Sequence, residues 1–369
     1  MKKVIFSTNL PSPYRVDFFN ELGKYCDLTV LYERKRSSER DKKWVGEGAE
    51  NFKEIYLNLE PVGTDRAKGN ALRGYIKTGE FDILIFTNYV SPATIEAILY
   101  CRIRRIPYFI EYDGGFNKRD SLPKLLLKKI LLKGAKGHFT TADEHIKYLR
   151  SLGIKENIIY KYPFTSINKV DVVSHGLSCE EKRSLRTELG ITEEKVILSV
   201  GQFIPRKGFD VLINAMPCLD KSIGLYLVGG EPTEEYKEAI ASLKLDNVHF
   251  VGFKTKAELR EYYRVADVFA FPTREDIWGL VINEAMAQGL PVVSTDRCIA
   301  ALEMVDDGEN GYIVETENES KLADGIRKVL CNGDYERLQL SAIEKANAYT
   351  IEKMVECHLE IFQQLIKKE

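Results

Sequence analysis

The chain has 369 residues, and its 53 basic and 55 acidic side chains leave a formal net charge of −2. This length is enough for two domains with separate hydrophobic cores. The balanced charge gives no sign of a nucleic-acid-binding protein, and no apolar run approaches the ~18 residues of a membrane span.

The distribution of the cysteines and the first residues of the chain both favour a location in the cytosol. The seven cysteines are scattered singly and mostly inside apolar segments, so they are expected to be reduced thiols in the core. Met1–Phe6 resembles the start of a signal peptide, but the polar stretch Ser7–Arg15 is unlike the apolar segment that must follow. A cytoplasmic location is therefore expected.

In the first half of the chain, short β-branched and aromatic runs alternate with helical patterns, which predicts a parallel sheet covered by helices on both faces. The expected strands are Val4–Phe6, Leu28–Tyr32, Ile83–Phe86 and Tyr108–Tyr112. After the first strand, two prolines stiffen the loop that leads into a helix. Pro13, Tyr14 and Arg15 belong to this loop, and Tyr14 and Arg15 are expected to project toward a ligand cleft. The alternative is a purely structural turn.

The segment Lys118–Lys136 holds seven basic residues and a single acid, Asp120. Drawn as a helix, it has an apolar stripe that is expected to face the core, made of Leu122, Leu126, Leu127, Ile130 and Leu131. Leu125 and Leu132 fall instead between pairs of lysines, where an exposed leucine suits an anionic bilayer surface. The segment therefore suits peripheral membrane binding, with a solvated basic helix as the alternative.

The polar stretch Tyr162–Cys179 is interpreted as the connection between two domains. Strands and helices alternate again after it, and the final segment is helical by its period. The expected strands are Val196–Val200, Gly224–Val228, Val248–Val251, Val268–Phe271 and Pro291–Ser294. We therefore expect domains at residues 1–170 and 180–341, followed by a C-terminal helix at 342–369.

The most informative pattern follows the strand Val268–Phe271. A loop is expected over Pro272–Gly279, and then a helix over Val281–Gln288 that stops at a glycine. Open α/β sheets bind ligands at this edge. Asp276 in the loop can therefore reach a reacting group, and Glu284, about one turn into the helix, can reach a ribose. The alternative is an ordinary crossover with incidental surface acids.

Two further features would bind phosphate. The backbone N–H groups of Gly279 and Leu280 lie at the start of the helix, where they face a would-be phosphate. In an earlier loop, a strand ends at Gly201, and Arg206 and Lys207 can neutralise a diphosphate, one as a planar fork and the other as a point charge. A surface Arg-Lys pair before a helix is the alternative.

The stretch Asp276–Val292 resembles the signature of retaining glycosyltransferase family four, the group 1 glycosyl transferases, and the resemblance is nearly continuous over residues 195–315. It implies an α/β fold of the GT-B type, in which two Rossmann-like parallel-sheet domains face a cleft and a C-terminal helix packs back on the first domain. In that family two glutamates separated by seven residues contact the donor sugar and the ribose. Asp276 stands at the first position, beside Glu275, and Glu284 at the second.

The resemblance assigns further donor-binding residues. Family members place an arginine and a lysine five apart in the loop that grips the donor diphosphate. Here Gln202 stands where the arginine is frequent and Lys207 is kept, so Arg206 is the candidate substitute. Gly230 belongs to a turn that looks like the family's glycine-rich turn, and Phe253 to the segment on which the base rests.

The implied activity is retaining transfer of a sugar from a nucleotide diphosphate, expected to be a UDP-sugar, to a glycan or polyprenyl-linked acceptor, as in capsule and other cell-surface polysaccharide synthesis. Asp113 falls where many relatives have a histidine that lines the donor site, so it is a candidate catalytic residue, with a turn cap as the alternative. The resemblance also implies that Pro13, Tyr14 and Arg15 lie on the acceptor side, near the acceptor or the diphosphate. Relatives often sit on the inner membrane face, which favours peripheral membrane binding through Lys118–Lys136. Because the chain contains no Asp-x-Asp, which holds a metal in the other major fold, no metal cofactor is expected.

Two other classes stay open. A nucleotide-sugar epimerase or phosphorylase on the same fold would need no acceptor alcohol, and a non-catalytic partner subunit is suggested by Asp276 and Gln202 at departing positions. A dinucleotide-dependent dehydrogenase is excluded, because the loop Ser7–Arg15 contains no glycine. The histidines show no ligand spacing and are interpreted as structural or surface residues: His138, His145, His175, His249 and His358.

Overall fold

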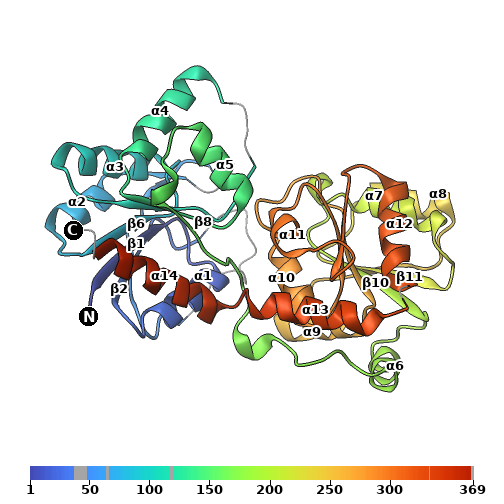
Figure 1. Ribbon diagram of the computed structural model, residues 1–369. Coiled ribbons are helices and arrows are strands. Elements are labelled where there is room, and N and C mark those ends of the chain that lie inside the picture. The colour runs from blue at the N-terminus through green and yellow to red at the C-terminus, as the bar shows by residue number, and fades with distance from the viewer. Residues whose placement is uncertain (37–47, 64–65, 117–119, 332, 367–369) are drawn as a thin grey trace. The chain divides into compact units, whose positions relative to one another are not determined.

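The structure is a computed structural model that describes residues 1–36, 48–63, 66–116, 120–331 and 333–366. The chain forms two compact units, residues 1–166 with 350–369 and residues 167–349. Each unit is built on its own parallel sheet (Figure 1), which confirms the expected α/β class with two parallel sheets. The unit boundaries differ from the expected ones, because residues 167–179 and 342–349 both belong to the second unit.

The first unit contains a parallel sheet in the order β3-β2-β1-β6-β7-β8-β9. The strands are β1 (Lys3–Thr8), β2 (Asp27–Tyr32), β3 (Lys53–Tyr56), β6 (Ile83–Phe86), β7 (Phe109–Glu111), β8 (Gly137–Thr140) and β9 (Ile159–Lys161). A short antiparallel pair is made by β4 (Glu60–Pro61) and β5 (Ala67–Lys68). The sequence predicted β1, β2, β6 and β7. It missed β3, β8 and β9, which are short and lack a continuous apolar run.

Helices cover both faces of this sheet (Figure 1). They are α1 (Pro13–Leu22), α2 (Ala71–Thr78), α3 (Pro92–Arg104), α4 (Leu122–Lys133), α5 (Asp143–Ser151) and α14 (Ile351–Ile366), with a 3-10 turn η1 (Glu156–Ile158). Proline in the first turn starts α1, α3 and α4, where its missing N–H costs nothing. The C-terminal helix α14 packs against α1, with the rings of Phe18 and His358 4.9 Å apart.

The helix α4 presents a different face to the core from the one predicted. Leu131 and Leu132 are buried and Leu125 is half-buried, whereas Leu122 and Leu126 are 81% and 61% exposed. Leu127 and Ile130 are also exposed, so the prediction that this stripe faces the core is wrong. Leucines occur on every face of the helix, and the apolar period therefore does not decide which face is buried. Lys118 and Arg119 lie outside the described residues.

A buried carboxylate stands at the carboxyl end of β2. Glu33 is fully buried and accepts hydrogen bonds from Ser91 Oγ and Thr94 Oγ1, both at 2.9 Å. Burial raises the pKa of Glu33 to about 7, although both hydroxyls oppose the shift. Because this pKa lies above the unfolded value, the group's contribution to stability is fully present below about pH 4.5 and is lost as the pH rises through about 7.

Replacing Glu33 with glutamine should therefore reduce the loss of stability between pH 5 and pH 8. The expected difference from the native chain is up to about 3 kcal/mol, since an amide has no proton to lose. Calorimetric unfolding at both pH values measures it, with the exposed Glu50→Gln as the control. Equal pH dependence in Glu33→Gln and the native chain would contradict the assignment.

The second unit contains a parallel sheet in the order β12-β11-β10-β13-β14-β15. Its strands are β10 (Lys195–Val200), β11 (Ile223–Val228), β12 (Val248–Val251), β13 (Val268–Phe271), β14 (Val292–Thr295) and β15 (Gly311–Val314). The sequence predicted all of these except β15. The order places β10 and β13 side by side at the centre, so the loops that follow them emerge next to each other at the carboxyl edge of the sheet.

The helices of the second unit include α10, which begins one residue before the predicted start. They are α6 (Cys179–Glu188), α7 (Phe209–Ala215), α8 (Glu234–Leu243), α9 (Lys256–Val265), α10 (Leu280–Ala287), α11 (Ile299–Met304), α12 (Glu319–Leu330) and α13 (Tyr335–Asn347). The 3-10 turns are η2 (Lys169–Asp171), η3 (Pro205–Lys207) and η4 (Met216–Cys218). Gly289, with φ of 71°, follows α10 as the expected helix stop.

All seven cysteines are free thiols, but the expectation that they lie mostly in the core is only partly correct. Three are buried, Cys26, Cys101 and Cys298. Cys357 is half-buried and the others are exposed: Cys179, Cys218 and Cys331. Every helix within the described ranges is too short or too polar to span a bilayer.

Candidate active site

The loop after β10 holds two cations at the carboxyl edge of the sheet. The chain passes through Gly201 into η3 and then through Gly208 into α7. Gly208 has a φ of 69°, and a Cβ at this position would collide with the carbonyl oxygen of Pro272. Glycine is therefore required for the turn that separates Arg206 and Lys207 of η3 from the helix.

The loop after β13 carries the first of the two acids. Its last residue, Gly279, has a φ of 101°, and a Cβ there would lie 2.7 Å from Cys298 Sγ. This glycine lets the chain turn sharply into α10. The backbone N–H of Asp276 donates to the carbonyl oxygen of Arg297 at 2.8 Å. The loop is thus held on both sides, and the Asp276 carboxylate is fixed in position.

The two loops bring Arg206, Lys207 and Asp276 together. Lys207 Nζ lies 2.6 Å from Asp276 Oδ2 and 4.8 Å from the centre of the Phe271 ring, and the side chains of both Lys207 and Asp276 are nearly buried. Arg206 is 46% exposed and lies 3.7 Å from the same carboxylate oxygen, while it donates to the carbonyl oxygen of Glu275 at 2.8 Å. Two cations and one anion leave a net positive charge that suits a bound diphosphate.

Glu284 lies about one turn into α10, the helix that follows the loop with Asp276. It lines a pocket of the second unit. Its Oε2 accepts a hydrogen bond of 3.1 Å from the hydroxyl of Tyr263, a buried residue of α9. The pocket is open to solvent, and the space of about 300 Å³ inside and in front of it includes part of that solvent. It is lined by Ile167, Asp171, Lys256, Leu259, Arg260, Tyr263, Glu284 and Gln288. A carboxylate held at the wall of a pocket can accept hydrogen bonds from a diol such as a ribose.

The opposite wall of this pocket was not predicted from the sequence. Asp171 of η2 forms ion pairs with Lys256, at 3.1 Å, and with Arg260. Burial would raise the pKa of Asp171, but these two cations outweigh it and lower the pKa. Gln288 Nε2 donates to the backbone carbonyl of Asp171 at 2.8 Å. The segment that begins the second unit is therefore tied to both α9 and α10.

The other predicted donor residues lie at the same edge of the sheet. Gln202 is exposed after β10, Phe253 is exposed after β12, and Leu280 is half-buried at the start of α10. Gly230 follows β11 and has open space around it, whereas a side chain at its neighbour Gly229 would collide with the backbone of Gly201. Their contacts with a donor stay predictions. No group of three or more potential metal-ligating side chains occurs among the described residues.

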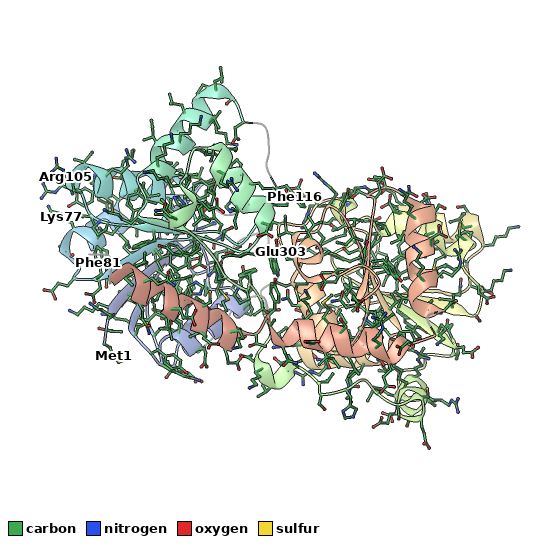
Figure 2. All side chains as sticks on the ribbon, viewed as in Figure 1. Met1, Lys77, Phe81, Arg105, Phe116 and Glu303 are labelled. Atoms are coloured by element: carbon green, nitrogen blue, oxygen red, sulfur yellow. The ribbon has the colours of Figure 1, made fainter. Side chains whose placement is uncertain are left out.

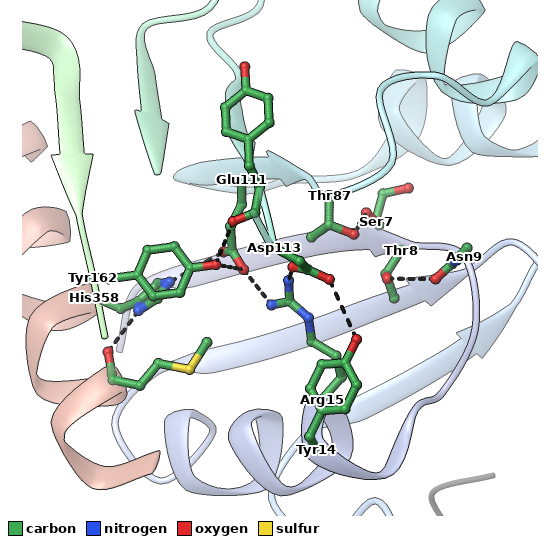
Figure 3. Close-up of polar contacts among 12 residues, drawn as sticks. Ser7, Thr8, Asn9, Tyr14, Arg15, Thr87, Glu111, Asp113, Tyr162 and His358 are labelled. Carbon is green, nitrogen blue, oxygen red and sulfur yellow. Dashed lines mark hydrogen bonds and ion pairs between the residues drawn. The ribbon is translucent and has the colours of Figure 1, made fainter. Parts of the chain in front are cut away.

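In the first unit, Arg15 is buried, whereas the sequence analysis expected it to project toward a ligand cleft. It is 2% exposed, and its guanidinium forms ion pairs with Glu111 and Asp113 (Figure 3). Burial would raise the pKa of Glu111, but the charge of Arg15 and hydrogen bonds from His358 and Arg15 lower it to about 2. Burial raises the pKa of Asp113, and the Glu111 carboxylate adds to this shift while Arg15 opposes it.

Further side chains complete this cluster. The hydroxyl of Tyr14 donates to Asp113 Oδ2 at 3.5 Å, and the hydroxyl of Tyr162 donates to Glu111 Oε1 at 3.2 Å. Pro13 is half-buried at the first turn of α1. His358 of α14 lies 3.2 Å from Glu111 Oε2 (Figure 3). Both terminal nitrogens of the buried Arg15 guanidinium therefore pair with carboxylates inside the first unit, and the Asp113 side chain, 31% exposed, lies just after the carboxyl end of β7.

The sequence analysis did not predict the contacts of four residues described above: Glu111, His358, Tyr263 and Asp171. A glutamate inside the apolar run Tyr108–Tyr112 was the one available signal, since a buried strand carries a carboxylate only when a cation pairs with it. The other three meet partners that are distant along the chain, and nothing in their local sequence marks them.

Residues 181–348 match the family model described as "Glycosyl transferases group 1". A curated relative from Haemophilus influenzae, an uncharacterized glycosyltransferase, is 32% identical over 178 residues, which cover 46% of this chain and 50% of the relative. The chain spans about half the length of the curated relatives it matches.

Two solved structures are similar over the full length of both chains. One is a glycosyltransferase from Rickettsia africae, with a TM-score of 0.78 and 20% identity. The other is the Anabaena protein HepE in complex with UDP, with a TM-score of 0.76 and 18% identity. At these identities the likeness concerns the fold. The chain therefore has the fold of the GT-B glycosyltransferases, and residues 181–348 carry the sequence features of the group 1 glycosyl transferases.

Proposed function

We propose that this protein is a retaining glycosyltransferase that moves a sugar from a nucleotide diphosphate to a hydroxyl of a glycan or polyprenyl-linked acceptor in cell-surface polysaccharide synthesis. The observation that carries the proposal is the cluster of Lys207, Arg206 and Asp276 in a unit that matches the group 1 family. A uridine nucleotide is the proposed donor, which is supported by the UDP bound to the structurally similar HepE.

In this proposal, the donor diphosphate lies on Lys207 and Arg206, with the N–H groups of Gly279 and Leu280 at the start of α10. Glu284 holds the ribose. When the diphosphate binds Lys207, it competes with Asp276 for the ammonium group, and this releases the carboxylate to bind hydroxyls of the donor sugar. The cations stabilise the charge that develops on the leaving diphosphate, which is where preorganised charge contributes most to rate.

The chemical step breaks the bond between the anomeric carbon and the diphosphate oxygen and forms a bond from that carbon to the acceptor oxygen on the same face. The acceptor's proton passes to an oxygen of the departing diphosphate. No side chain is assigned as nucleophile, and no divalent metal is proposed, because two cations stand at the diphosphate position. Asp113 of the first unit is the proposed contact for the acceptor hydroxyl.

The proposal predicts metal-independent binding of one nucleotide. Uridine, guanosine, thymidine and adenosine diphosphates should be titrated in thermal-shift experiments with Mg²⁺ and with a chelator. One of them is expected to raise the melting temperature by mass action, and the shift should disappear in Lys207→Ala and Glu284→Ala. No shift with any diphosphate would contradict donor binding and favour a non-catalytic partner subunit.

We further propose that the protein is cytoplasmic and binds the inner membrane face through α3 and α4. Exposed apolar side chains on these helices are Leu122, Leu126, Ile130 and Ile103. Exposed basic residues surround them: Arg102, Arg104, Arg105, Lys124 and Lys133. Arg102 also donates to the carbonyl oxygen of Ile130 at 2.7 Å and so joins the two helices, while Arg105 projects from the end of α3 (Figure 2).

A combined Leu122→Glu and Leu126→Glu variant should therefore lose binding to vesicles that contain phosphatidylglycerol. Each basic residue near such a surface contributes about 1 kcal/mol, and buried leucine side chains add to it. Flotation measures the bound fraction, with Leu340→Glu on α13, another exposed leucine, as the matched control. Binding that does not depend on anionic lipid would rule out this surface.

A further inference from the structure

Both ring nitrogens of His358 face hydrogen-bond acceptors. Nδ1 lies 2.7 Å from the backbone carbonyl oxygen of Met354, one turn earlier in α14. Nε2 lies 3.2 Å from Oε2 of Glu111. A carbonyl oxygen only accepts, and so does an ionised carboxylate. A neutral imidazole carries a single N–H and can satisfy one of these two contacts, so the pair of His358 and Glu111 requires one additional proton.

The hydrogen bonds around Glu111 place this proton on the histidine. The other carboxylate oxygen, Oε1, accepts from Arg15, and the hydroxyl of Tyr162 shares its single proton between this oxygen at 3.2 Å and the carbonyl oxygen of Tyr112 at 3.0 Å. Arg15 is always charged in proteins, and its ion pair stabilises the ionised form of Glu111. With Glu111 ionised, the ring of His358 must donate from both nitrogens.

The charges of the cluster support the same assignment. Arg15 and Glu111 are buried and His358 is fully buried, while the side chain of Asp113 is 31% exposed. If His358 is neutral, the cluster of Arg15, Glu111, Asp113 and His358 has one positive and two negative charges. An unpaired charge in a buried site is costly. Counted with a charged His358, the cluster has two cations and two anions and is neutral.

The remaining surroundings of the ring are aromatic. The rings of Tyr162, Phe18 and Phe139 lie 4.7, 4.9 and 5.4 Å from the imidazole, and aromatic faces attract a cation. The titratable groups in contact with the ring are Glu111 and Tyr162, with Arg15 and Asp113 behind Glu111. All of these residues belong to the first unit, where they lie on α1, β7, β8, the segment after β9 and α14 or directly beside them.

We propose that His358 is a buried imidazolium and a positioning residue, which balances the charge of Arg15, Glu111 and Asp113 and thereby keeps Asp113 ionised as the acceptor of a hydrogen bond. The part that concerns Asp113 rests on the proposed function, in which this carboxylate meets the hydroxyl of the acceptor. The charge of His358 itself does not depend on that function.

The charge can be read directly from ¹⁵N spectra of the intact protein labelled on histidine, at pH 7.5. His358 should show two protonated ring nitrogens, and its signals are assigned by their loss in His358→Gln. His138 and His145 serve as internal controls, since burial lowers the pKa of the first to about 4 and of the second to about 3. A neutral pattern for His358 would overturn the proposal, whether or not the protein proves to be a transferase.

The positioning role is tested by the pH dependence of kcat/KM for sugar transfer. In His358→Gln, Asp113 loses a neighbouring positive charge, so the acidic limb should move upward by about one pH unit. UDP binding to the second unit should be unchanged. His145→Gln, at another buried histidine of the first unit, should leave the position of the limb unchanged. A loss of activity in His358→Gln that is uniform across pH would overturn the positioning role.

Discussion

Replacing Lys207 with methionine should lower kcat/KM for sugar transfer by on the order of 10²–10³-fold, the usual effect of removing a group that stabilises transition-state charge. Methionine keeps most of the length of the side chain and its contact with the Phe271 ring, but removes the ammonium group 2.6 Å from Asp276. The variant leaves Asp276 without its cation, so the binding of the diphosphate and the orientation of the sugar should both suffer.

The matched control is Lys328→Met. Lys328 of α12 also places its ammonium near an aromatic ring, 5.1 Å from the centre of Tyr312, but it lies on the exposed surface of the second unit. Its replacement should change kcat/KM by less than about twofold, as expected for a surface position. Equal activities of Lys207→Met and Lys328→Met would show that Lys207 does not act on the donor.

Replacing Arg15 with methionine should destabilise the first unit by about 3–5 kcal/mol at pH 7, because it removes the buried cation that pairs with both Glu111 and Asp113. The loss should shrink below about pH 4.5. Glu111, whose pKa is lowered to about 2, contributes stability that is present above its unfolded value and is lost as the pH falls toward 2.

Calorimetric unfolding of the native chain and of Arg15→Met at pH 7 and pH 4 measures the loss of stability and its dependence on pH. A double variant, Arg15→Met with Glu111→Gln, should recover part of the loss, since one buried charge is removed with its partner. Arg73→Met is the control, because Arg73 pairs with Glu96 at 2.7 Å on the surface, where such a pair contributes about 0–1 kcal/mol. A melting temperature in Arg15→Met equal to that of Arg73→Met would contradict the role of the buried cluster.

The sequence predicted the strand, loop and helix that carry Asp276 and Glu284 because the signals for these elements are local. The strand Val268–Phe271, the loop with Asp276 and the helix with Glu284 follow one another directly, and the glycine at position 279 permits the turn that α10 requires. The pairing of Lys207 with Asp276 is also accessible from the sequence, since two strands that are neighbours in a parallel sheet bring their following loops together.

The buried cluster of the first unit could not be predicted in the same way. Arg15 follows a polar loop, where a cation is usually exposed. Its burial depends on Glu111 and Asp113, which lie almost a hundred positions later in the sequence. His358 meets Glu111 across 247 positions. The prediction of the buried face of α4 was wrong for a different reason. A helix with leucines on all faces has more than one possible buried stripe, and packing against neighbouring elements decides among them.

Calorimetric titration of UDP in the presence of a chelator tests whether the second unit binds a nucleotide diphosphate through Lys207 and Glu284 without a metal. We expect one site per chain whose affinity falls at least about tenfold in Lys207→Met and in Glu284→Ala, equivalent to about 1.4 kcal/mol each, and is unchanged in Lys328→Met. Binding of equal affinity in all four proteins, or binding that appears only with Mg²⁺, would contradict it.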